Sequence, residues 1–175
     1  MASLDSSALC TSCGLCCDGT LFSRIELAPG EDGAGLETAG MRLVEANGVR
    51  KASQPCAALK GCNCTAYSIR PAVCRDYRCN LLRRLDAGET DVESALEIVA
   101  SARRLRAEAM EQFARACPLP EGLSMKEYAH LAGADAMKTA QARRDNQAML
   151  VACTLFQFHI SRHFQKYSLE ADPET

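Results

Sequence analysis

Nine of the chain's eleven cysteines lie between positions 10 and 79, and they form two runs. The first run is Cys10-x-x-Cys13-x-x-Cys16-Cys17, and the second holds Cys56, Cys62, Cys64, Cys74 and Cys79. Thiolates are soft, anionic ligands that suit zinc and iron–sulfur clusters, and a CxxC pair lets two of them reach one metal. The spacing therefore predicts a metal-binding segment.

A disulfide framework is the competing interpretation of so many cysteines. The N-terminal residues Met1–Ala8 have neither the basic nor the apolar stretch of a secretory signal, so we expect a cytoplasmic protein. Cytosolic thiols stay reduced, and an odd number of cysteines cannot all pair within one chain. Metal binding is the favoured interpretation.

Nine clustered thiols could supply two four-ligand sites with one thiol left over, since a structural zinc site takes four ligands. Cys16 and Cys17 are adjacent, and neighbouring side chains point apart in most backbone conformations. We expect them to serve different centres, or one to bind metal while the other packs.

The order of these cysteines, with Tyr67-x-x-Arg70-Pro71 and Cys74-Arg75-x-Tyr77-x-Cys79 in the second run, resembles the YkgJ-like CxxCxxCC family. Its members are mostly bacterial and are described as zinc- or iron-chelating, or as containing an iron–sulfur cluster. The resemblance covers residues 10–80. It implies metal ligands at Cys10, Cys13, Cys16, Cys17, Cys56, Cys64, Cys74 and Cys79, and leaves Cys62 as the spare thiol or a further ligand.

Two arginines adjoin the second cysteine run. Four thiolates leave either Zn²⁺ or a [4Fe–4S]²⁺ cluster with a net charge of about −2. Arg70 and Arg75 could offset that charge and donate hydrogen bonds to sulfur, from outside the ligand set. The alternative is that both arginines pair with surface carboxylates.

Composition excludes several classes of function. Residues 1–88 carry ten basic and nine acidic side chains, and residues 89–175 carry ten and thirteen, so neither half has the charge of a nucleic-acid binder. The arginines at 103, 104 and 106 are expected on a solvated helix face. No apolar run approaches the roughly 20 residues that span a bilayer. We expect neither nucleic acid nor a membrane as partner.

The fold class predicted is α-rich α+β with two parts. Residues 1–88 should form an irregular cysteine-rich module, with short strands at 21–27 and 49–53 and a short helix at 36–46. Residues 89–175 are rich in helix formers and should pack as a helical hairpin or three-helix layer. Capping boxes are predicted at Thr90-x-x-Glu93 and Ser124-x-x-Glu127, a break at Gly133, and a long last helix from Asp135 into the 160s.

Other residues with chemical potential are expected to be structural. Cys117 and Cys153 stand alone on predicted helices and are interpreted as core thiols. His159 and His163 share one helix face, but they have no acidic partner motif and are interpreted as a packed or surface pair.

Three functions remain open at this point. The first is an iron–sulfur protein, of the [4Fe–4S] type among others, for electron transfer, sensing or support of a partner. The second is a zinc-stabilised module whose helical half binds another protein. The third is a metal-dependent enzyme, because a similar cysteine run occurs in flagellin lysine methylases. Spacing alone does not separate iron–sulfur from zinc, since both accept four thiolates.

Overall fold

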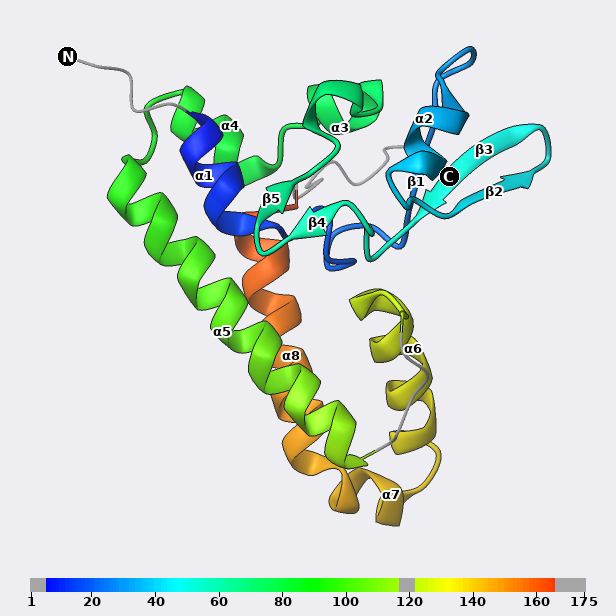
Figure 1. Ribbon diagram of the computed structural model, residues 1–175. Helices are drawn as coiled ribbons and strands as arrows, with labels where there is room; N and C mark the ends of the chain where they lie inside the picture. Colours follow the sequence, from blue (N-terminus) through cyan, green and yellow to red (C-terminus); the bar gives the residue numbers. More distant parts are fainter. Residues whose placement is uncertain (1–5, 117–121, 166–175) are drawn as a thin grey trace, which may run out of the picture.

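The computed structural model describes residues 6–116 and 122–165 (Figure 1). Helices predominate, and short antiparallel strands complete an α+β fold as predicted. The helices are α1 (Ser6–Cys13), α2 (Gly33–Thr38), α3 (Ala72–Asp76), α4 (Asn80–Asp86), α5 (Val92–Ala116), α6 (Met125–Ala136), α7 (Ala140–Asp145) and α8 (Gln147–His163). The strands are β1 (Arg24–Glu26), β2 (Leu43–Ala46), β3 (Val49–Ser53), β4 (Leu59–Lys60) and β5 (Asn63–Cys64).

The helical part is built on α5, which packs along α8, while α6 lies beside them (Figure 1). Small and apolar residues recur on the inner face of α5 at helical spacing, which lets α8 approach closely. Helices α1 and α4 pack against the other end of α5. Together they enclose the main core, whose buried members are Leu9, Leu15, Leu21, Leu81, Leu82, Ala95, Val99, Ala102, Ala109, Phe113, Met125, Ala132, Ala136, Met149, Ala152, Phe156, Ile160 and Phe164.

The other part is built on a three-stranded antiparallel sheet with the order β1-β3-β2. One face of this sheet and α2 enclose the small core, made of Ile25, Leu27, Leu36, Met41, Ala52, Ala58 and Ala66. Phe22 packs against both cores and meets Tyr77 edge-on, with ring centroids 4.8 Å apart. The main core draws residues from both sides of position 88.

The helix predicted at 36–46 is wrong beyond its first residues. Helix α2 ends at Thr38, and the chain then enters β2. Asn47 and Gly48 have φ angles of 55° and 73°, the left-handed pair that joins strands in a tight hairpin. Asn-Gly therefore turns β2 back onto β3 and does not cap a helix. The strand predicted at 49–53 is confirmed as β3, and the one at 21–27 is shorter, as β1.

The start predicted for the long last helix, near Asp135, is wrong, although the helix does run into the 160s, because α7 and the end of α6 occupy its first part. Gly133 does not break a helix but lies inside α6, which ends at Ala136. Thr139 then starts α7 by accepting a hydrogen bond from the Ala142 amide, and α8 begins only at Gln147. The capping box at Ser124-x-x-Glu127 is confirmed.

At the start of α5 the predicted capping residue is displaced by one position. The Asp91 carboxylate, and not Thr90, accepts from the Ser94 amide, at 2.7 Å. Cys117 lies outside the described residues. So does Pro118, where we expected this helix to end because proline cannot continue a helix. None of the helices in the described ranges is both long and apolar enough to cross a membrane.

Candidate metal centre

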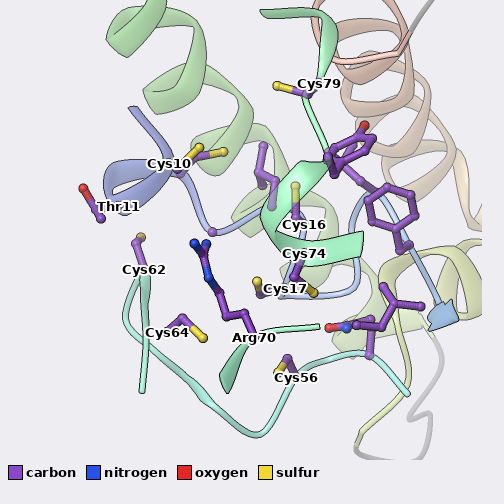
Figure 2. Close-up of a pocket in the computed structure, with 18 of the residues that line it drawn as sticks. Cys10, Thr11, Cys16, Cys17, Cys56, Cys62, Cys64, Arg70, Cys74 and Cys79 are labelled. Carbon is purple, nitrogen blue, oxygen red and sulfur yellow. The ribbon is translucent and has the colours of Figure 1, made fainter. Parts of the chain in front are cut away.

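All nine clustered cysteines line one cavity of about 310 Å³, which lies where the two cores meet (Figure 2). The ten described cysteines are free thiols. The cavity wall is shared by residues of the α1 loop, the β4–β5 hairpin, α3 and the start of α4. Segments far apart in the sequence therefore bring the two cysteine runs together, as the sequence predicts for a metal-binding segment.

Four of the thiols form a set on the side of the helices, which we call the helical group: Cys10, Cys13, Cys16 and Cys79. Cys10 and Cys13 lie on α1 three residues apart, so they share one helix face. Cys79 is the N-cap of α4, and its sulfur accepts a hydrogen bond from the Leu82 amide at 3.4 Å. The N-terminal end of a helix favours a thiolate over a thiol.

Burial and mutual proximity determine the charge state of the helical group. Burial, with smaller contributions from the neighbouring Cys79 and Cys10, raises the pKa of Cys13 to about 12. Burial also raises the pKa of Cys16 far above its usual range, again with contributions from the other members of the group. These thiols hold their protons near neutral pH without a metal, and a bound cation would supply the charge that lets them ionise.

The other four thiols lie on the side of the sheet and form the sheet group: Cys17, Cys56, Cys64 and Cys74. The Cys56 amide donates to the Cys17 carbonyl at 2.7 Å, which fixes the two runs against each other. Cys64 ends the β4–β5 hairpin. Cys74 lies on α3, whose first amide, that of Ala72, donates to the Glu31 carboxylate at 2.6 Å.

Within the sheet group the same two causes act. Burial, with smaller contributions from Cys56, Cys74 and Cys64, raises the pKa of Cys17 to about 12. Burial, with smaller contributions from Cys56 and Cys64, raises the pKa of Cys74 to about 11. Each member of the sheet group is thus close to the others, whereas the helical group interacts with it mainly through the adjacent pair Cys16 and Cys17.

The two groups rest on different cores. Cys13, Cys16 and Cys79 pack against the main core, while Cys56, Cys64 and Cys74 pack against the small core. The boundary between the groups falls at the peptide bond from Cys16 to Cys17. Within the described ranges, no three His, Cys, Asp or Glu side chains are already arranged around one ion position. The sulfurs instead surround a wider space.

Cys62 belongs to neither group. It occupies the turn of the β4–β5 hairpin beside Gly14, with its sulfur 3.6 Å from where a Cβ of Gly14 would lie. Gly14 has a φ of 73°, which lets the α1 loop turn back past this point. Cys62 is therefore a thiol on the cavity wall outside both sets of four.

The two arginines singled out by the sequence lie differently. Arg70 lines the cavity, and its guanidinium carbon stands 3.8 Å from the centroid of the Tyr67 ring. Arg75 is exposed, and its guanidinium donates to the carbonyl oxygen of Arg70. Arg75 thus fixes the backbone that carries Arg70.

Two arginines of α5 hold the first cysteine run in place. Arg106 pairs with Asp18 at 3.0 Å and donates to the Thr20 hydroxyl at 3.2 Å, and Arg103 donates to the Ser12 carbonyl at 3.0 Å. Arg103 and Arg104 are exposed, as expected for a solvated face, whereas Arg106 is partly buried against Asp18, so the expectation is wrong at 106. Asp18 and Arg106 are separated by 88 residues, so no local sequence pattern predicts this ion pair, and only the tertiary fold reveals it.

The remaining candidates lie away from the cavity. The rings of His159 and His163 meet at a tilt, with centroids 4.7 Å apart, and the His159 ring forms a hydrogen bond with the Ile98 carbonyl at 3.0 Å. They form a packed pair, as the sequence predicts. Cys153 is partly buried against the main core, as expected for a core thiol.

The profile of the CxxCxxCC family, described as a "putative zinc- or iron-chelating domain", matches residues 9–118. This is more than half of the chain, so the protein belongs to that family. The match runs past the cysteines and through α5, the helix whose arginines hold the first cysteine run. No curated protein and no solved structure matches the chain.

Proposed function

We propose that the protein binds metal at two cysteine centres, one held by the helical group and one by the sheet group. The observation that carries this proposal is the division of eight free thiols, all lining one cavity, into two sets of four. Four thiolates complete either a zinc site or a cubane cluster. Because the described thiols are unpaired, a reducing compartment such as the cytoplasm suits this function.

Iron–sulfur clusters are the occupants that the cavity favours. The cavity has a volume of about 310 Å³, whereas a single water-sized occupant needs only about 10–15 Å³. Two bare ions would leave most of that space unused. Zn–S bonds are about 2.3 Å long, so the sulfur atoms of two thiolates on one zinc ion lie only about 3.8 Å apart. The roomy cavity lined by all nine clustered thiols supports a cluster with its own bridging sulfides.

Bound clusters would supply one-electron chemistry, and the chain's own residues would set its conditions. Cys79 presents its sulfur at the amino end of α4. Phe22 and Tyr77, whose rings meet edge-on, line the cavity with apolar surface. These features would tune the potential of a centre through burial and hydrogen bonds to sulfur.

The test is the composition of protein purified without oxygen. We expect a brown sample with visible absorbance, containing iron and acid-labile sulfide. A colourless sample that contains zinc would mean that the two thiolate centres hold zinc and not iron–sulfur clusters. Protein without metal, with its cysteines in disulfides, would refute the proposal.

A second candidate function, binding to another protein, is favoured by the outer face of α8. Val151, Leu155 and Phe158 lie on one stripe at helical spacing, and their exposed fractions are 51%, 50% and 59%. Large apolar side chains gathered on one face mark interaction surfaces. If a partner protein binds to this face, the Leu155→Glu substitution should abolish its binding and leave the metal content unchanged. Equal binding of the partner by the wild-type protein and the Leu155→Glu variant would refute this role.

A further inference from the structure

One cation points into the cavity between the two thiol groups. Figure 2 shows the Arg70 side chain extending between Cys10 on one side and Cys17 and Cys64 on the other. The Nε atom of Arg70 is buried and has no hydrogen-bond partner. A buried N–H donor of a charged group is costly unless an acceptor or an opposite charge compensates it.

No carboxylate supplies that compensation within the described part of the chain. Each ion pair found there joins other residues, and the Tyr67 ring covers one face of the guanidinium. What faces Arg70 is sulfur. Burial raises the pKa of Cys10 in the helical group and of Cys74 in the sheet group, and the nearby charge of Arg70 opposes that rise at both thiols, together with Arg78 at Cys10.

The local fold keeps the arginine in this position. A single 3₁₀ turn, Tyr67–Ile69, precedes Arg70, and Pro71 follows it as the N-cap of α3. The Arg75 side chain holds the Arg70 carbonyl, while the Glu31 carboxylate holds the next amide along, that of Ala72. The backbone on both sides of Arg70 is thereby fixed, and its side chain is directed inward.

We propose that Arg70 is the shared counter-ion of both metal centres and couples them. This inference rests on the proposed function. Each filled four-thiolate centre would carry about −2, so two of them around one cavity repel each other. A single cation between them stabilises both and weakens that repulsion. The metal affinity of each centre therefore depends on the same arginine.

Zn²⁺ can serve as the probe ion, measured by competition with a chromophoric chelator on the reduced full chain. Two backgrounds isolate the centres: Cys13→Ser with Cys79→Ser leaves the sheet group, and Cys56→Ser with Cys74→Ser leaves the helical group. In both backgrounds Arg70→Gln should weaken zinc binding about 10–100-fold, the effect typical of residues that support metal ligands. Lys60→Gln removes an exposed charge from the neighbouring hairpin and should change neither affinity.

The Arg70→Lys variant distinguishes the effect of losing the positive charge from the effect of disturbing the fold. It keeps the cation, so it should retain most of the affinity in both backgrounds. Circular dichroism of every variant checks that the helices remain. A loss confined to one centre, unchanged affinities in Arg70→Gln, or an Arg70→Lys protein as weak as Arg70→Gln would overturn the proposal. If the wild-type chain binds no zinc and carries no metal, the proposed function itself fails.

Discussion

The two thiol groups share one cavity but differ in what supports them. The helical group is backed by the main core, with Cys13 at the end of α1 and Cys79 at the start of α4. The sheet group is backed by the small core and lies mostly on a hairpin and short turns. A large core can position ligands by itself, whereas a small one depends on bonds to metal. The sheet group should therefore depend more on its metal.

Metal removal should produce the largest effect and test this difference directly. A structural thiolate site can contribute on the order of 10 kcal/mol to folding, so a chelator should unfold the region around the sheet group. Amide hydrogen exchange in β1–β5 and α3 should accelerate strongly, while α5 and α8 remain protected. Loss of the helices in the same step as the metal would contradict the difference between the groups.

The next effect comes from truncating one core at a time. Leu15 is fully buried beneath the helical group, and Leu36 is its counterpart in the small core. Each change to Ala should cost about 2–5 kcal/mol of unfolding free energy. Leu15→Ala should weaken metal at the helical group only, and Leu36→Ala at the sheet group only. Denaturant melts with metal titrations check this, and equal losses at both groups would contradict it.

Gly19 anchors the first cysteine run to α6 and offers a smaller, sharper test. Its φ is 85°, and a Cβ there would lie 2.8 Å from the Ser124 Cα. Gly19→Ala should therefore cost about 2–4 kcal/mol through strain and overpacking. Gly30 has a similar φ of 82° with open space around it, so Gly30→Ala reports the strain alone. Equal losses of thermal stability in Gly19→Ala and Gly30→Ala would contradict the close contact between Gly19 and Ser124.

Cys153 should have the smallest effect. It lies on α8, apart from the cavity, and packs partly against the main core. Cys153→Ala should leave metal stoichiometry unchanged and cost about 1 kcal/mol in packing. Elemental analysis and a thermal melt measure both quantities. Any loss of metal would place Cys153 among the ligands.

Thiol spacing predicted a metal-binding segment and allowed two four-ligand sites, and the family resemblance supplied the candidate ligands, but neither assigned each thiol to a group. Cys74 and Cys79 are five residues apart, yet they lie in different groups. The reason is α4, whose Leu81 and Leu82 are buried in the main core and draw Cys79 toward the helices. That docking depends on contacts with distant residues, and local sequence carries no sign of it.

Local misinterpretation of the fold had equally local causes. Asn47-Gly48 suits both a helix end and a hairpin turn, and the pairing of β2 with β3 decided for the turn. Gly133 was expected to break a helix, but one glycine costs only about 1 kcal/mol within a helix, which packing of α6 readily offsets. The strong periodicity of α5 and α8, in contrast, made the helical layer predictable.

The central claim is that the chain divides its thiols into two centres between Cys16 and Cys17. Its most direct test is the metal and sulfide content of three proteins purified alike without oxygen: Cys79→Ser, Cys56→Ser and the double variant. Each single substitution should remove about half of the wild-type metal, and the double variant should lose nearly all of it. If either single substitution removes all of the metal, the thiols form one centre and the division is wrong.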